Sequence, residues 1–157
     1  MIHSAALLTR SEANSKPRGH AARRNARVLA LQSLYEVSSV GHDADEALDS
    51  RFQECTQAVA ASFCRTLVQG VLANSEEIDK IISAFAPNWP LAQMALVDRN
   101  ILRIAIYEII MGHETPPKVA INEAVELAKV FGSDSSPKFV NGVLGSVMES
   151  LKQGTKS

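Results

Sequence analysis

The sequence has few cysteines and no long apolar segment, so it lacks the features of disulfide-bonded secreted proteins and of membrane-spanning proteins. Its only cysteines are Cys55 and Cys64, and no histidine lies near them at the spacing of zinc ligands, so neither a disulfide framework nor a zinc site is predicted. No segment approaches the roughly 18 consecutive apolar residues of a membrane span, and the apolar residues 5–8 are too few for a signal peptide. We therefore expect a cytoplasmic protein without membrane contact, whose cysteines are reduced and structural.

The motifs of catalytic centres are missing as well. The four histidines are scattered, and none lies near a nucleophile motif or a glycine-rich phosphate loop. Carboxylate pairs such as Glu76 with Glu77 and Glu123 with Glu126 could exchange protons, but charged residues on a helix are more often solvated surface. We therefore predict no enzyme activity, no cofactor and no metal.

What the sequence has is helical periodicity in an ordinary globular composition. Its 157 residues are 46% hydrophobic and 21% charged, which is typical of one soluble domain. Apolar residues recur at the three-and-four spacing of helices, and no run alternates at period two, so we predict an all-α domain of about six to seven helices. The predicted helices are 23–38, 43–54, one around 63–72, 78–85, 102–110, one from the prolines at 116 and 117 to Gly132, and one from about Pro137.

Domain limits follow from the same pattern. Residues 1–20 mix polar residues, proline and glycine with little periodicity, so a flexible N-terminal extension is expected there. The helical domain is expected over residues 21–152, followed by a tail at 153–157. Gly41, Pro87 and Pro90 interrupt the pattern, and Gly112 is expected to end the most apolar helix.

The charges are unevenly distributed although the formal net charge is only −1. Residues 10–35 contain six basic residues and one acid, whereas residues 36–79 contain nine acids and two basic residues. Such an asymmetry indicates a polyanionic partner for the basic end. Arg23, Arg24 and Arg27 lie closest together there, and positions 23 and 27 share a helix face, so their guanidinium groups could contact successive phosphates. A solvated basic face would show the same pattern.

The segment SPKFVNG, residues 136–142, begins the last predicted helix. With Ser136 as the cap and Pro137 as the first helical residue, the N–H groups of Lys138 and Phe139 would face an anion. Asn141 could bind a base edge, and the Phe139 ring could stack on a base. The alternative is that Phe139 belongs to the core and that Gly142 allows close helix packing.

Four blocks of the sequence closely resemble the NusB family of transcription antitermination factors. They are ARRNARVLALQSLY (22–35), DRNILRIAIYEI (98–109), KVAINEAVELAK (118–129) with FG at 131–132, and KFVNGVL (138–144). They occur in the family's order at compatible spacing, and the resemblance extends over about residues 21–151. Residues 36–79 match mainly in helical pattern and acidic character.

The resemblance implies a fold of two packed helical subdomains without catalytic activity. It also implies binding to the boxA element of ribosomal RNA transcripts as single-stranded RNA, together with ribosomal protein NusE, within an RNA polymerase antitermination complex that promotes processive transcription. Relatives can also form homodimers that hide the RNA surface. The family's RNA contacts map onto Arg23, Arg24, Arg27, Lys118, Asn122, Lys138, Phe139 and Asn141, and its NusE contact maps onto Asp98. Asn25 departs from the pattern, because relatives often carry a further cation there.

Two other functions fit parts of the sequence. A helical adaptor could use the acidic block to bind a basic protein without RNA. An RNA methyltransferase could carry a similar helical module, but would need a second domain with a glycine-rich cofactor loop. The RNA-binding hypothesis makes a specific structural demand: the start of the first helix and the start of the last should converge on one surface.

Overall fold

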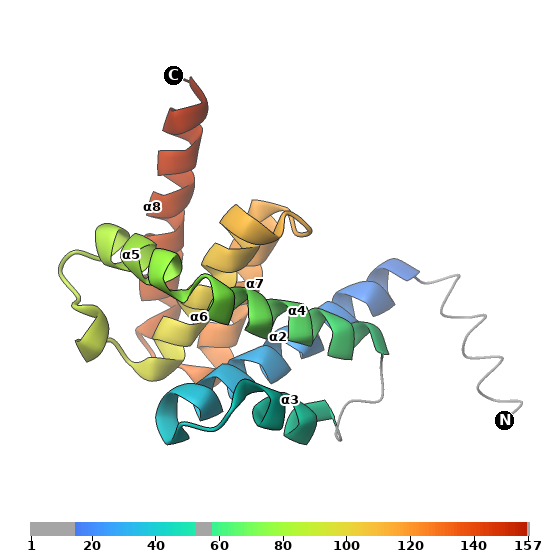
Figure 1. Ribbon diagram of the computed structural model, residues 1–157. Helices are drawn as coiled ribbons and strands as arrows, with labels where there is room; N and C mark the ends of the chain where they lie inside the picture. The colour runs from blue at the N-terminus through green and yellow to red at the C-terminus, as the bar shows by residue number, and fades with distance from the viewer. Residues whose placement is uncertain (1–14, 53–57, 157) are drawn as a thin grey trace, which may run out of the picture.

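The computed structural model describes residues 15–52 and 58–156, which form an all-α protein (Figure 1). The α-helices are α2 (Ser15–Val40), α3 (Ala44–Phe52), α4 (Ala58–Ala73), α5 (Ser75–Phe85), α6 (Leu96–Ile106), α7 (Pro117–Phe131) and α8 (Ser136–Lys156). A 3-10 turn, η1 (Leu91–Gln93), precedes α6, and a π-helical segment, η2 (Tyr107–Gly112), follows it. No strand occurs in the described ranges, and the predicted fold class with its six to seven helices is confirmed.

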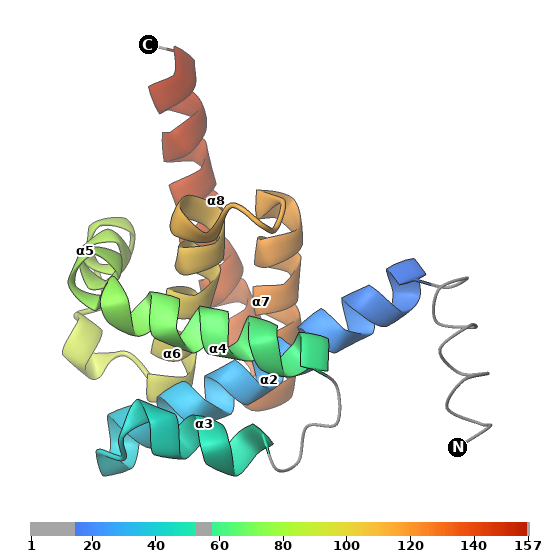
Figure 2. The same ribbon diagram turned by 45° about the vertical axis from the view of Figure 1, so that its right-hand side comes forward.

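The helices pack in two groups, as the resemblance implied. α2 packs against α3 and α4, while α7 and α8 form a hairpin that packs against α6, and α5 packs against α6 and α8. Figure 2 shows α6, α7 and α8 running upright, with α4 and α2 crossing the lower parts of α6 and α7. Leu67 of α4, Leu102 of α6 and Leu144 of α8 are all fully buried in a single apolar core that joins the two groups.

The first and last helices are longer than the sequence predicted. α2 begins at Ser15, so residues 15–20, which were expected in the N-terminal extension, are helical, and residues 1–14 lie outside the described residues. Pro17 is tolerated because the first N–H groups of a helix have no partner within it, and the alanine- and arginine-rich stretch that follows favours helix. α8 likewise continues to Lys156, through most of the expected tail. Gly41, with φ +72, ends α2 as predicted.

The end of α6 differs from the predicted regular helix. The chain widens into the π-helical η2 over six residues, and the left-handed residue that ends it is His113, with φ 56, rather than Gly112. The Tyr107 ring occupies the space that a side chain at Gly70 of α4 would need. A π-helical turn shifts the following side chains around the helix axis. Glu108, the second residue of η2, is therefore turned into the core, where it is only 3% exposed.

Candidate nucleic-acid interface

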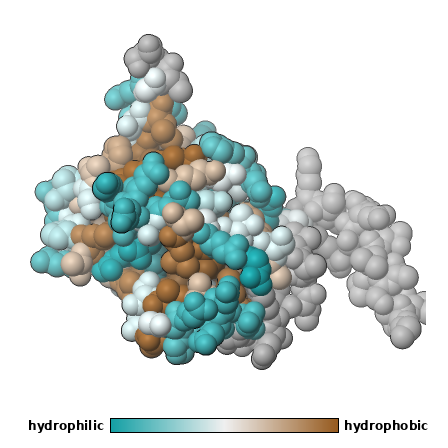
Figure 3. All heavy atoms as spheres, viewed as in Figure 1, coloured by the Kyte–Doolittle hydropathy of each residue, from teal (hydrophilic) through white to brown (hydrophobic). Residues whose placement is uncertain are grey.

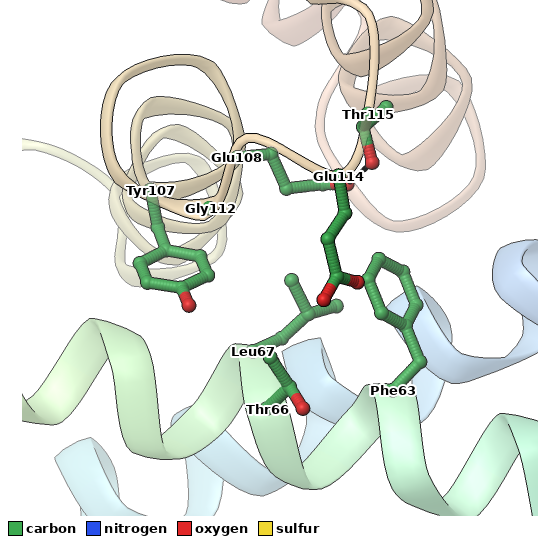
Figure 4. Close-up of a pocket in the computed structure, with 8 residues that line it drawn as sticks. All are labelled: Phe63, Thr66, Leu67, Tyr107, Glu108, Gly112, Glu114 and Thr115. Atoms are coloured by element: carbon green, nitrogen blue, oxygen red, sulfur yellow. Dashed lines mark hydrogen bonds between the residues drawn. The ribbon is translucent and has the colours of Figure 1, made fainter.

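Arg27 of α2 is a core residue. Its guanidinium donates from Nε to Glu108 Oε2 at 2.9 Å and from Nη2 to Glu108 Oε1 at 2.7 Å. The Thr115 hydroxyl donates to the same Glu108 Oε1 at 2.8 Å. Figure 4 shows the Glu108 and Thr115 side chains meeting above Phe63 and Leu67 of α4. Both charged side chains are 2–3% exposed, so the predicted phosphate contact by Arg27 is corrected: this charge is neutralised inside the protein.

Arg23 and Arg27 do share a face, but that face points at an aromatic ring rather than at solvent alone. The guanidinium carbons lie 4.9 Å (Arg23) and 5.2 Å (Arg27) from the centroid of Phe63. Stacking on a ring holds a guanidinium through its π face and leaves its edge N–H groups able to donate. Arg23 is half-buried, and its edge N–H groups can still donate to a ligand. Arg27 instead donates from Nε and Nη2 to Glu108.

Arg24 connects the start of α2 to the middle of α7. Its Nε and Nη2 each donate to a carboxylate oxygen of Glu123 at 3.0 Å, and His20 lies 3.2 Å from the same carboxylate. Burial alone would raise the pKa of Glu123, but the hydrogen bonds and charge of Arg24, with the charges of Arg27 and His20, lower it below its usual 4.5. The hydrogen bond to Glu123, followed by its charge, raises the pKa of Arg24. About half of the Arg24 side chain remains exposed.

The first half of α7 presents two of the predicted residues beside this ion pair. Lys118 and Asn122 are exposed, and they lie one turn apart on the same side of the helix. Further along α7, Lys129 is paired with Glu126 at 3.1 Å. Lys118, unlike Lys129, has no ion pair within the described residues.

The start of α8 differs in detail from the predicted cap. The helix includes Ser136, which is buried and whose hydroxyl accepts the Ser133 N–H at 2.9 Å. The Phe139 N–H donates to the Ser135 carbonyl at 3.1 Å, and Pro137 has no N–H. This terminus therefore offers fewer amides to an anion than the sequence predicted.

The side chains at this terminus are nevertheless placed for a ligand. Lys138 and Asn141 are exposed and share one side of α8. A side chain added at Gly142 would meet no atom within 4 Å, so Gly142 does not serve close helix packing within the chain. Phe139 is partly buried against the core, which is the alternative considered for it, but its ring also meets Trp89 at a centroid distance of 6.0 Å. Sequence reasoning missed Trp89, although a lone tryptophan between two prolines was a signal.

The basic starts of α2 and α8 each lie next to α7. Arg24 reaches the middle of α7 at Glu123, whereas α8 begins beside the end of α7, five residues after Phe131. A helix rises about 12 Å over the eight residues between those points. The two starts therefore lie at different points along α7, with Arg24 at its middle and α8 beginning beyond its end, and their convergence on one surface stays a prediction. Figure 2 shows the start of α2 projecting away from the upright hairpin.

Asp98, the predicted partner contact, lies in the first turn of α6 and is only 8% exposed. Its Oδ1 is buried and has no hydrogen-bond partner among the described residues. A buried carboxylate oxygen without a donor is costly.

The remaining predictions concern chemistry that the interface would not use. Cys64 is buried, and Cys55 lies outside the described residues. Within residues 15–52 and 58–156, no cluster of three or more potential ligands could hold a metal ion. None of the helices in those ranges has the length and apolar character needed to cross a membrane.

An all-α fold of two helical groups, with exposed basic residues beside the starts of its first and last helices, defines a class of small helical nucleic-acid-binding proteins. The NusB family profile matches residues 24–149, and the chain belongs to the NusB family. It is 45% identical over 135 residues to the transcription antitermination protein NusB of Dehalococcoides mccartyi, covering 85% of this chain and 94% of that one.

Solved structures show the same fold. NusB of T. maritima is 33% identical with a TM-score of 0.76, over 81% of this chain and 90% of that one. A complex of antitermination factors NusB and NusE with double-stranded RNA contains a chain that is 26% identical, with a TM-score of 0.76, over 83% of this chain and 98% of that one.

Proposed function

We propose that this protein is a transcription antitermination factor that binds boxA RNA together with ribosomal protein NusE. Relatives at about 45% identity carry the antitermination name, and a structural neighbour forms a complex with NusE and RNA. The protein acts by binding rather than by catalysis, within the RNA polymerase antitermination complex.

The observation that carries this proposal is the set of exposed cationic and amide side chains on the α7–α8 hairpin. Lys118 and Asn122 lie on α7, and Lys138 and Asn141 lie on α8. No ion pair within the described residues engages either lysine, in contrast to Arg24 and Arg27. Exposed lysines without an internal counterion can exchange their counterions for phosphates, and this exchange drives RNA binding at low salt.

Arg23 and Arg24 extend this surface at its α2 end. Arg24 remains half exposed in its pair with Glu123, so its outer edge can reach a phosphate while the pair stays formed. Arg23 keeps edge donors while it stacks on Phe63. A backbone that follows α7 from its start would pass Lys118 first, then Asn122 and the Arg24–Glu123 pair, and finally the start of α8.

Asp98 supports the NusE part of the proposal. Its Oδ1 is buried, so a donor from a partner protein could reach this side chain only through the part of Asp98 that remains exposed. Because only 8% of Asp98 is exposed, the partner must press closely against the first turn of α6. Asp98→Asn retains the shape but replaces one acceptor with a donor, and it should weaken NusE binding.

The test is RNA binding measured against salt, with and without NusE. Lys118→Ala should weaken binding of boxA RNA and lower the slope of log affinity against log salt by about 0.7, the value for one phosphate on a single strand. Lys80→Ala on α5, which removes a lysine that is also exposed, is the matched control and should change neither. Equal effects of the two substitutions would show that only total charge matters and would contradict the proposed surface.

The acidic helix α3 favours a second candidate, an adaptor for a basic protein. Asp45, Glu46 and Asp49 are exposed, and Figure 3 shows hydrophilic residues over this part of the molecule. An adaptor of this kind would bind NusE with full strength and would not respond to boxA RNA. Cooperative binding of RNA and NusE distinguishes the proposed function from it.

A further inference from the structure

The loop between α5 and α6 holds an aromatic side chain in solvent. Trp89 is 57% exposed, although most of the surface of a tryptophan side chain is usually buried. Its ring meets Phe139 of α8 edge to face, at 6.0 Å between centroids and 73° between planes. Residues 50 positions apart in the sequence thus form one aromatic pair, with Phe139 as the partly buried support and Trp89 as the exposed ring.

The loop that carries Trp89 is ordered by its own contacts. The Trp89 N–H donates to the Ala86 carbonyl at 3.1 Å, and the Gln93 N–H donates to the Pro90 carbonyl at 2.9 Å. Pro87 and Pro90 restrict the backbone on both sides of the tryptophan, and Met94 anchors the far end in the core at 5% exposure. The exposed ring is therefore held in place before any ligand arrives, which lowers the entropic cost of binding.

The surroundings of this aromatic pair favour an anionic ligand. Lys138 is exposed and immediately precedes Phe139, at the positive end of a 21-residue helix without an acid in its first turn. Asn141 lies on the same side as Lys138 and offers both a donor and an acceptor. The described segment 132–141 contains one acid, Asp134, and one base, Lys138; Asp134 precedes the helix, and Lys138 lies in its first turn.

We propose that Trp89 is a base-stacking residue, and that it binds an unpaired nucleobase of single-stranded RNA with Phe139 as its support and Lys138 on the adjacent phosphate. This inference rests on the proposed function and extends its RNA surface across α8 onto the α5–α6 loop. An exposed flat ring beside a cation matches a nucleotide, which joins a π face to a phosphate. A base paired within a duplex is stacked on its neighbours and cannot cover the ring.

The chain provides its own probe for this contact, because Trp89 is its only tryptophan. We would titrate the full chain with boxA RNA in the presence of NusE, follow tryptophan emission, and measure affinity in parallel by the anisotropy of labelled RNA. Correction for emission from NusE uses the Trp89→Phe chain as a blank. Stacking of a base on Trp89 should quench its emission with the same midpoint as the anisotropy change.

The variants separate stacking from charge. Trp89→Ala should weaken RNA binding about 5- to 100-fold while leaving the salt slope unchanged, and Trp89→Phe, which keeps a ring, should restore most of the affinity. Tyr35→Ala removes another exposed aromatic side chain, 44% exposed on α2, and should leave RNA binding unchanged. Trp89 and Tyr35 are both exposed, so Trp89→Ala, Trp89→Phe and Tyr35→Ala should fold as the unmodified chain does. Their circular dichroism spectra and their NusE binding should match those of the unmodified chain.

The outcomes distinguish the inference from the proposed function. RNA that binds with unchanged Trp89 emission, and equally well to Trp89→Ala, would overturn the stacking site and leave antitermination intact. Loss of NusE binding in Trp89→Ala with unchanged RNA binding would assign the ring to a protein partner and would also overturn it. Equal quenching by a duplex of the same sequence would contradict an unpaired base as the ligand. Absence of RNA binding by every chain would overturn the proposed function together with the site.

Discussion

The start of α2 and the start of α8 are both basic in sequence, yet the structure uses their charges differently. On α2, Arg27 is neutralised in the core by Glu108, and Arg24 is tied to Glu123. On α8, Lys138 is exposed and has no ion pair within the described residues. The arginine cluster of α2 therefore offers less positive charge to a ligand than its sequence indicates. Lys138 at the start of α8 keeps its whole charge exposed to solvent.

The difference has a physical basis in the two side chains. Arginine forms paired hydrogen bonds with a carboxylate in a fixed geometry, which suits it to the buried pair with Glu108. Lysine is more strongly hydrated and remains in solvent as a mobile point charge. In this protein Arg27 and Arg24 hold α2 against η2 and α7, whereas Lys118 and Lys138 are exposed and have no ion pair within the described residues.

The largest expected effect concerns the buried pair. Arg27→Met removes one partner and leaves the Glu108 carboxylate uncompensated in the core, so it should lower the free energy of unfolding by about 3–5 kcal/mol. Arg24→Met, at the pair that is half exposed, should cost about 1 kcal/mol or less. Urea unfolding followed by circular dichroism measures both, and similar losses for the two variants would contradict the distinction between a structural and a surface arginine.

The next effect concerns the contact between α4 and η2. A side chain at Gly70 would overlap the Tyr107 ring, so Gly70→Ala should destabilise the protein by about 1–3 kcal/mol through overpacking. Gly142→Ala on α8 meets no atom within 4 Å and should stabilise by up to about 1 kcal/mol, because alanine favours helix. Thermal unfolding of the pair checks the contrast. Stabilisation by Gly70→Ala would mean that Tyr107 can move aside at little cost.

A smaller effect should appear as pH dependence at the Arg24–Glu123 pair. The folded state lowers the pKa of Glu123 below its usual 4.5, so its carboxylate contributes stability above that pH and loses it as the pH falls through the lower folded-state pKa. The stability difference between the unmodified chain and Glu123→Gln should therefore be greatest near neutral pH, at about 1 kcal/mol or less, and should vanish in acid. A difference that grows as the pH falls would contradict this assignment.

Sequence reasoning predicted the helices well and the roles of individual side chains less well. Periodicity located α6, but it could not reveal the π-helical η2, because an apolar pattern does not distinguish a π-helical turn from a regular one. It placed Arg23 and Arg27 on one face correctly, yet the partner that buries Arg27 is 81 residues away. Trp89 was missed because its contact with Phe139 is also tertiary. The resemblance to a family predicted which residues form the RNA surface, and the structure shows which of their charges are paired within the protein and which are exposed.

The most direct test of this account compares the two basic helix starts in one binding experiment. The slope of log affinity against log salt for boxA RNA, with NusE present, would be measured for Lys138→Ala and for the double variant Arg27→Met/Glu108→Leu, which removes the buried pair without leaving a lone charge. We predict a slope lowered by about 0.7 for Lys138→Ala and an unchanged slope for the double variant. A lowered slope for the double variant with an unchanged one for Lys138→Ala would contradict the account.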